Sequence, residues 1–222
     1  LPYLTTIAAD DNLLSFFTRI NYTMADKYLA TFTLRADGSS KFGDGHRWGY
    51  FPSLALAWRM SEEKWLKNVK WLSNLKARLS FGTAGNNRIP DGSMYTTFSV
   101  AGTGDKSIYF GDQTATVLKH GDILSNPELK WETTISRNLG FDFGFWNNRL
   151  SGSLDFYWNT TQDLLMKTTI AASSGYGYQY KNLGQTSNKG VELQLDGVIL
   201  DKKNYGLNFN FNISYNRGKI DK

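Results

Sequence analysis

The sequence contains no cysteine, which excludes disulfides, thiolate zinc sites and cysteine nucleophiles. It has only two histidines, His46 and His120, so it is poor in the side chain that most metal centres and catalytic triads use. No apolar run approaches the roughly 18–20 residues of a membrane-spanning helix. There is no initiator methionine and no signal peptide, so Leu1 reads as an internal start. A net charge of +5 is too small to indicate a nucleic-acid partner.

Aromatic side chains are abundant instead. The 222 residues include 14 Phe, 12 Tyr and 7 Trp, beside only 4 Pro. The mean hydropathy of −0.42 is polar, but it does not exclude a membrane protein. In a transmembrane β-barrel only alternate residues face lipid, so the mean stays polar.

Apolar and polar residues alternate with a period of two along most of the chain, which predicts strands with one apolar face. In 205–215, Tyr205, Phe209 and Phe211 share one face and asparagines occupy the other. The same alternation recurs in seven further segments: 16–22, 28–35, 54–60, 75–81, 131–145, 150–158 and 191–199. Strands of globular proteins average roughly 5–6 residues, whereas a tilted membrane strand needs roughly 9–11. The sequence therefore predicts an all-β, antiparallel, up-and-down transmembrane barrel wall of about eight strands.

The predicted connections alternate in length. Those on one side of an up-and-down sheet are 23–26, 61–74, 147–148 and 200–204, and those on the other side are 38–49, 83–130 and 162–187. Short turns on one side and long loops on the other are typical of outer-membrane barrels. Within 61–74, Glu62 and Glu63 resemble the acidic first turn of a helix. With Trp65 and Val69 following at helical spacing, we expect a short amphipathic helix at the membrane surface or a helical turn on the barrel rim.

Aromatic residues gather at the ends of the predicted strands. The set at the short-turn end is Tyr22, Tyr28, Phe145, Trp146 and Tyr205, and the set at the long-loop end is Trp131, Trp158 and Tyr215. Two such girdles are expected where rings meet lipid headgroups, although aromatic residues are also good strand formers. Arg137 falls on the apolar side of its strand. Because a charge at the bilayer midplane costs about 2–4 kcal/mol, we predict that Arg137 lies at headgroup level.

The sequence gives little evidence of a catalytic site. The glycine-bearing segment 82–87 lacks the ending of a phosphate loop, and 37–40 and 43–45 do not match the spacing of a twelve-residue calcium loop. The acids on the polar side, Asp142, Asp155, Glu192 and Asp196, could resemble a glycosidase pair. Their neighbours Lys76 and Arg78 fit charge balance on a wet wall better. We predict no catalytic residue, no cofactor site and no metal site, and hence no enzyme.

Several stretches, in order, resemble the barrel of SusC/RagA-type TonB-dependent transporters of Bacteroidota. They are LRADGSSKFG at 34–43, RWGYFPS at 47–53, AWRMSEE at 57–63, LKARLSFG at 75–82, NPELKWETT at 126–134, NLGFDFG at 138–144, NRL at 148–150, NLG at 182–184 and NKGVEL at 188–193. Each block alone is weak, but their ordered combination is specific and covers most of the chain.

The resemblance implies a 22-stranded outer-membrane barrel with an N-terminal plug and a SusD-like surface lipoprotein as a lid. It implies import of oligosaccharides or peptides, driven by the TonB complex, in the outer membrane of a Gram-negative, Bacteroidota-like bacterium. Outer-membrane lipid and lipopolysaccharide would surround the barrel, and no nucleic acid is implied. Residues 1–222 would then be part of the barrel domain of a longer transporter, with the plug domain outside this segment.

Loop 162–187 carries Tyr176, Tyr178 and Tyr180 among glycines, and we expect these rings to touch the ligand or the lid, or else to pack the loop. Two other functions remain open. One is a small, complete eight-stranded outer-membrane barrel with a structural or adhesive role. The other is a soluble glycan-binding β-sandwich, which would have to hide Phe209 and Phe211 beneath a second sheet.

Overall fold

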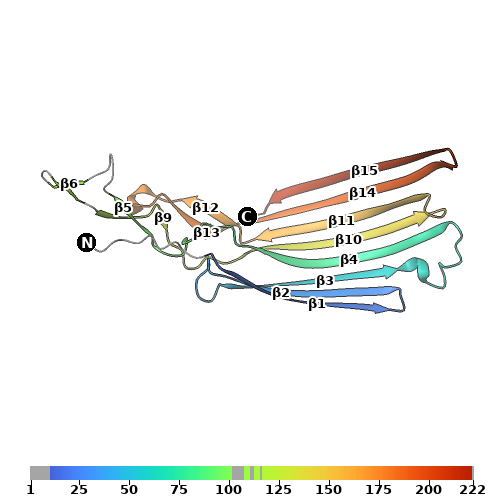
Figure 1. Ribbon diagram of the computed structural model, residues 1–222, viewed down its shortest axis with the longest axis horizontal. Helices are drawn as coiled ribbons and strands as arrows, with labels where there is room; N and C mark the ends of the chain where they lie inside the picture. Colours follow the sequence, from blue (N-terminus) through green and yellow to red (C-terminus); the bar gives the residue numbers. More distant parts are fainter. Residues whose placement is uncertain (1–10, 102–107, 111–112, 116, 222) are drawn as a thin grey trace.

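The computed structural model describes residues 11–101, 108–110, 113–115 and 117–221, and its main element is one antiparallel sheet of eight strands (Figure 1). The strands lie in the order β1-β2-β3-β4-β10-β11-β14-β15. Their bounds are β1 Leu13–Met24, β2 Tyr28–Ser39, β3 Trp48–Arg59, β4 Leu72–Asn86, β10 Glu132–Phe145, β11 Leu150–Gln162, β14 Gln185–Lys202 and β15 Tyr205–Ile220. All eight coincide with the predicted segments and extend beyond most of them, so the up-and-down order is confirmed.

The two ends of the sheet differ as the connection lengths predicted. The connections 25–27, 60–71, 146–149 and 203–204 lie at one end, on the right in Figure 1, and 40–47, 87–131 and 163–184 lie at the other. The turn after β10 holds Trp146, Asn147 and Asn148 at φ values of 52°, 55° and 58°. Asparagine tolerates this left-handed backbone, which matches the twist of a tight hairpin.

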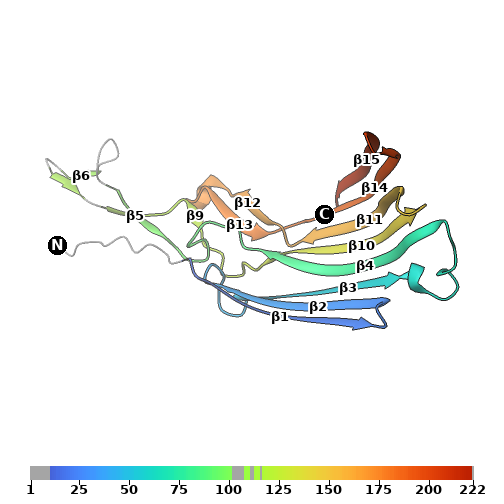
Figure 2. The same cartoon turned by 45° about the vertical axis from the view of Figure 1, so that its right-hand side comes forward.

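The long connections contain short strands that the alternation did not predict. They are β5 Phe98–Ala101, β6 Ile108–Phe110, β7 Gln113–Ala115, β8 Val117–His120, β9 Ile123–Leu124, β12 Leu165–Thr169 and β13 Tyr178–Asn182, with a 3-10 turn, η2, at Ala172–Ser174. β13 pairs antiparallel with β12 and parallel with β9, so segments 40 or more residues apart meet beyond the wall (Figures 1 and 2).

Connection 61–74 forms helical turns and no continuous amphipathic helix, so the second of the two expectations holds. A 3-10 turn, η1, spans Met60–Glu62, and the Glu63 carbonyl then accepts from the N–H groups of Leu66 and Lys67 at 2.9 and 2.8 Å. The Glu63 carboxylate ties this turn to the sheet: it accepts hydrogen bonds from the Tyr28 hydroxyl at 2.7 Å and the Trp58 indole N–H at 3.2 Å. It also pairs with Lys27 at 3.2 Å. These bonds, the one from Tyr28 first, hold the pKa of Glu63 below its ordinary value.

Cross-strand register gives the sheet two distinct faces. We call the first the apolar face: one of its rows runs through all eight strands as Tyr22, Ala30, Leu56, Leu79, Leu139, Phe156, Val191 and Tyr215. We call the second the polar face: its adjacent row is Asn21, Thr31, Ala55, Ser80, Asn138, Tyr157, Gly190 and Asn216. Because the side-chain period of a strand is two, this register keeps the separation intact across the whole sheet.

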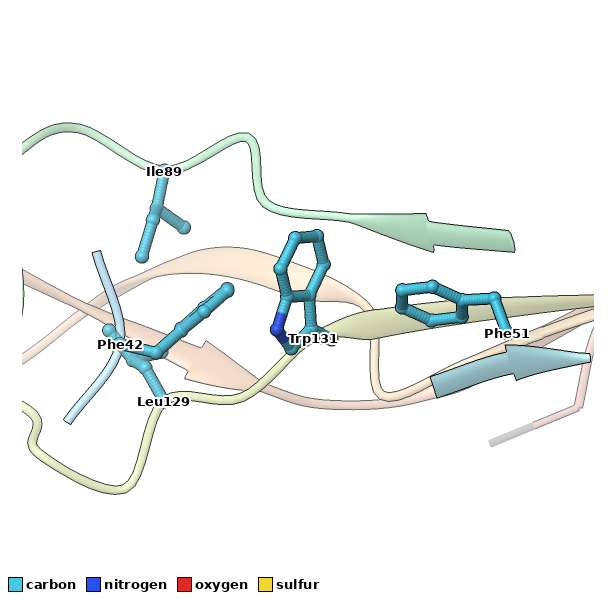
Figure 3. Close-up of a cluster of buried hydrophobic side chains, with 5 residues drawn as sticks. All are labelled: Phe42, Phe51, Ile89, Leu129 and Trp131. Carbon is cyan, nitrogen blue, oxygen red and sulfur yellow. The ribbon is translucent and has the colours of Figure 1, made fainter. Parts of the chain in front are cut away.

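The apolar face has no cover among the described residues. Leu139 is 41 % exposed and Phe211 is 47 % exposed. The buried hydrophobic side chains lie instead at the long-loop end, where Phe42, Phe51, Ile89, Leu129 and Trp131 form one cluster (Figure 3). We call this cluster the loop core. A globular sheet of this size would bury one face, so the described wall depends on something outside it for burial.

Trp131 corrects the predicted outer girdle. It is 9 % exposed, with ring centroids 5.2 Å from Phe42 and 5.5 Å from Phe51, and its indole N–H donates to the Arg47 carbonyl at 3.0 Å. The strand begins one residue later, so Trp131 escapes the alternation and packs beside Phe51 (Figure 3).

The predicted turn-end girdle lies at the strand ends, whereas Trp158 and Tyr215 of the predicted loop-end girdle lie four and five residues inside their strands. At the turn end, Tyr28 stacks on Trp58 at 6.3 Å, and Phe145 lies 5.6 Å from Trp71. At the loop end, Trp158 is 56 % exposed.

Candidate functional site

The polar face carries a charge cluster that spans three neighbouring strands. Arg78 of β4 donates to both oxygens of Asp142 on β10, at 2.7–3.0 Å, and its Nη2 also donates to Asp155 of β11 at 3.1 Å. Lys76 lies 3.6 Å from Asp142. The two carboxylates that could have formed a glycosidase pair are thus bound to the same guanidinium. This arrangement agrees with charge balance on the wall.

Gly140 makes this bridge possible. A Cβ atom at Gly140 would lie 2.5 Å from Asp155 Oδ1 and 2.8 Å from Arg78 Cζ. The Arg78 side chain therefore crosses β10 where that strand has no side chain on the polar face. The alternation predicts which face Gly140 occupies, but it does not reveal the bridge.

The three loop tyrosines have different surroundings. Tyr178 and Tyr180 of β13 contact each other edge to face, with centroids 6.0 Å apart, and Lys167 Nζ lies 3.7 Å from the centre of the Tyr178 ring. Tyr176 lies just before β13 and packs on the His120 ring at 4.3 Å. Tyr180 packs against the loop core. The alternation of the sequence does not reveal the contacts of His120 and Lys167, because these contacts join segments distant in the chain.

A pocket of about 400 Å³ opens on the polar face at its loop end. Its lining includes the ion pair of Arg35 and Asp37, 2.7 Å apart, and the side chains of Asn87, Phe51 and Trp131. Charged, amide and aromatic groups therefore meet in this pocket, at the loop end of the wall. Sequence reasoning missed this site because Trp131 was assigned to the opposite face.

Metal and helical membrane features do not occur in the described ranges. No group of three or more histidine or acidic side chains there could hold a metal ion. Within the same ranges, no helix is long and apolar enough to cross a bilayer. The glycine-bearing segments considered for calcium use their acids in ion pairs, with Asp44 3.1 Å from Arg47.

Comparison with known proteins identifies this architecture. A family model described as "TonB dependent receptor-like, beta-barrel" matches residues 2–222. The TonB-dependent receptor SusC of Bacteroides thetaiotaomicron is 38 % identical over 219 residues, 98 % of this chain and 22 % of SusC. The TonB-dependent receptor P26 of Formosa agariphila is 35 % identical over 98 % of this chain and 21 % of its own length. The chain therefore spans about a fifth of the length of these curated relatives.

Solved structures agree with this match. The RagAB peptide transporter superposes with a TM-score of 0.82 at 34 % identity, covering 95 % of this chain and 22 % of the other. The siderophore receptor PirA from Pseudomonas aeruginosa, at 16 % identity and a TM-score of 0.58 over 93 % of this chain and 32 % of its own, shares the fold. This chain belongs to the TonB-dependent receptor β-barrel family, is similar to its SusC/RagA-type members, and forms part of such a barrel.

Proposed function

We propose that this chain forms part of the wall of an outer-membrane importer of oligosaccharides or peptides. In this proposal the TonB complex energises import, a SusD-like surface lipoprotein covers the loop end, and the host is a Gram-negative, Bacteroidota-like bacterium. The observation that carries the proposal is the eight-stranded wall with one uncovered apolar face and one polar, charge-paired face.

Lipid hydrocarbon is the surrounding that suits the apolar face best. A soluble β-sandwich would need a second sheet over residues such as Leu139 and Phe211. The three smaller sheets of the described ranges are formed by strands of the long connections instead, and they leave Leu139 and Phe211 exposed. A complete eight-stranded barrel would pair β1 with β15, and the described sheet has these two strands at its opposite edges. Both alternatives are therefore weaker than a section of a larger barrel.

The polar face suits a water-filled lumen. Large barrels enclose an aqueous channel or a plugged lumen, where amide, hydroxyl and paired charged groups exchange hydrogen bonds with water and solute. The Arg78 cluster is charged yet internally paired, so the cluster presents no isolated charge to a passing polar solute. The pocket beside Arg35 and Trp131 offers ring faces and hydrogen-bonding groups, which both sugars and peptides can use.

For the loop tyrosines, we assign the ligand or lid contact to Tyr176 and Tyr178 and a supporting role to Tyr180. The first two lie half-buried beside His120 and Lys167, whereas Tyr180 packs on the loop core. Replacing Tyr176 and Tyr178 together by alanine should lower uptake or lid affinity while the barrel stays folded. Tyr180→Ala should act mainly through stability. Unchanged uptake and unchanged lid affinity in the double variant would remove this assignment.

The function is tested on the full-length protein in its host. Deleting its gene should abolish uptake of a fluorescent oligosaccharide set or a fluorescent peptide set, and a protonophore should have the same effect on the intact strain. The protein should fractionate with the outer membrane. Recovery in the soluble fraction without detergent, or uptake that survives the deletion for both probe sets, would overturn the proposal.

A further inference from the structure

Three basic side chains lie in one transverse row on the apolar face. Arg137 of β10 is opposite Trp158 of β11, Trp158 is opposite Lys189 of β14, and Lys189 is opposite Arg217 of β15. Neighbouring strands lie about 4.8 Å apart, so the row is about 15 Å long. We call Arg137, Trp158, Lys189 and Arg217 the basic row.

The cations of this row have no acidic partner in the part of the chain that the structure describes. The Arg137 guanidinium lies 5.0 Å from the centre of the Trp158 ring, and its Nη1 donates to Thr160 at 3.4 Å. Lys189 and Arg217 are exposed and form no ion pair there. The carboxylate of Asp221, at this end of the face, already accepts from Ser187 at 3.2 Å and pairs with Lys219 at 3.6 Å. The row therefore keeps its positive charge.

The row lies where the apolar band ends. Arg137 is eight residues from Phe145 along β10. With a rise of about 3.4 Å per residue and a strand tilt of about 40°, this is about 20 Å along the barrel axis, close to the roughly 25 Å height of an apolar band. On the other half of the sheet the same row holds Ile20, Phe32, Leu54 and Phe81. Within this row, the positive charge is thus confined to β10, β11, β14 and β15. Arg217, twelve residues from Tyr205 along β15, lies farther from the turn end than Arg137 does, as tilted strands require.

We propose that the basic row binds the phosphate groups of an anionic lipid headgroup in the outer leaflet. Arginine donates paired hydrogen bonds that match phosphate oxygens, lysine adds a mobile positive charge, and tryptophan favours the boundary between headgroups and hydrocarbon. This inference rests on the proposed outer-membrane function, because only a bilayer brings headgroups to this height on the apolar face. It assigns the binding of anionic lipid to the half of the apolar face formed by β10, β11, β14 and β15.

The test uses the full-length protein in nanodiscs of zwitterionic lipid, titrated with bisphosphorylated lipid A. The variant combines Arg137→Gln, Lys189→Gln and Arg217→Gln. The matched control combines Lys64→Gln, Lys202→Gln and Lys203→Gln, which removes the same charge from exposed residues at the turn end. Each Lys or Arg near an anionic lipid surface raises the affinity roughly five-fold. The triple variant should therefore lose about a hundred-fold in apparent affinity for lipid A. The control lysines lie at the opposite end of the wall from the basic row, so their loss should leave the affinity of the row for lipid A nearly unchanged.

Three outcomes separate this inference from the proposed function. If the protein is in the outer membrane and the variant binds lipid A as tightly as the control, the inference is overturned while the function stands. If the protein is absent from the outer membrane, the function itself fails. If inorganic phosphate competes as well as lipid A does, the site takes free phosphate and the lipid assignment is wrong. Should the triple variant not fold, the double variant Lys189→Gln and Arg217→Gln takes its place. Its apparent affinity for lipid A should fall about 25-fold.

Discussion

The loop end and the wall of this chain are stabilised in different ways. At the loop end, Phe42, Leu129 and Trp131 bury one another inside the chain, with Phe42 and Leu129 at 0 % exposure. Along the wall, a strand ladder that joins all eight strands is accompanied by an apolar face that no described residue covers. Burial at the loop end is thus supplied by the chain itself, and burial along the wall must be supplied by its surroundings. Substitutions in the two regions should therefore respond differently to lipid.

The polar face adds a further contrast within the wall. Its stabilising contacts are lateral: Arg78 joins β4 to β10 and β11 through two carboxylates. Such contacts hold strands together without burying them, which is suited to a surface that faces water. On the apolar face, comparable polar contacts lie toward the strand ends, where Tyr28 and Trp58 bind Glu63 and where Ser187 and Lys219 bind Asp221.

The largest expected effect is in the loop core. Trp131→Ala removes a buried indole and the hydrogen bond to the Arg47 carbonyl, so it should cost about 3–5 kcal/mol of local stability. The loss should be the same in detergent and in lipid. Hydrogen exchange of the segments that contact the core measures it. Trp158→Ala, at a 56 % exposed tryptophan, is the control and should leave this exchange unchanged. Equal effects of the two substitutions would contradict a separate loop core.

A charge on the apolar face should have the next largest effect. Leu139 lies two residues inside Arg137 on the apolar face, so Leu139→Arg should cost part of the about 2–4 kcal/mol of folding free energy that a charge costs at the bilayer midplane. Asn138→Arg, one residue away on the polar face, is the matched control and should cost much less. Denaturant titration of the full-length protein in lipid vesicles gives both values. A larger loss for Asn138→Arg would reverse the assignment of the faces.

Disturbing the Arg78 bridge over Gly140 should have an intermediate effect on stability. Gly140→Ala places a Cβ atom 2.5 Å from Asp155 Oδ1, so the Arg78 guanidinium must move, at a cost of roughly 1–3 kcal/mol. Combining it with Arg78→Gln should cost clearly less than the sum of the two single changes, since both disturb one network. The unfolding free energies of the four proteins in this cycle check the coupling. Simple additivity would show that the bridge is not disturbed by the new methyl group.

Substitutions at the turn end should have the smallest effect on stability, and this effect should depend on pH. Hydrogen bonds from Tyr28 and Trp58, and the Lys27 ion pair, lower the pKa of Glu63 below 4.5. A lowered folded-state pKa stabilises the fold above pH 4.5, and that contribution is lost as the pH falls through the folded-state value. Glu63→Gln should therefore lower the melting temperature slightly at pH 7 and by less in acid. Glu62→Gln, exposed beside it, is the control. A melting-temperature offset that does not change with pH would contradict this role.

Much of the wall could be predicted because strand alternation is local. The eight segments, their order and the face of residues such as Leu139 follow from a period of two, and the loop asymmetry follows from counting. Trp131 was assigned wrongly because the alternation does not say where a strand begins. Of the two expectations for 61–74, the helical turn was right and the amphipathic helix was wrong, and only the fold shows that the Glu63 side chain bonds to Tyr28 and Trp58.

The loop site could be predicted only in part. Tyr176, Tyr178 and Tyr180 were identified by composition, but their partners His120 and Lys167 come from contacts that no local pattern reports. The basic row shows the opposite case. Arg137 stood out as a charge on the apolar side, and only the register of four strands joined it to Lys189 and Arg217.

The most direct test of the central claim is spin labelling along β10 of the full-length protein in lipid vesicles. This chain has no cysteine, so single cysteines at Leu139 and Phe141, and at Asn138 and Asp142, can each be labelled once any cysteine elsewhere in the full-length protein is replaced by serine. Collision rates with oxygen, which concentrates in hydrocarbon, and with a water-soluble nickel chelate are then compared. The account predicts that Leu139 and Phe141 favour oxygen and that Asn138 and Asp142 favour the chelate. The reverse pattern, or no alternation, would contradict a wall with lipid on one side and water on the other.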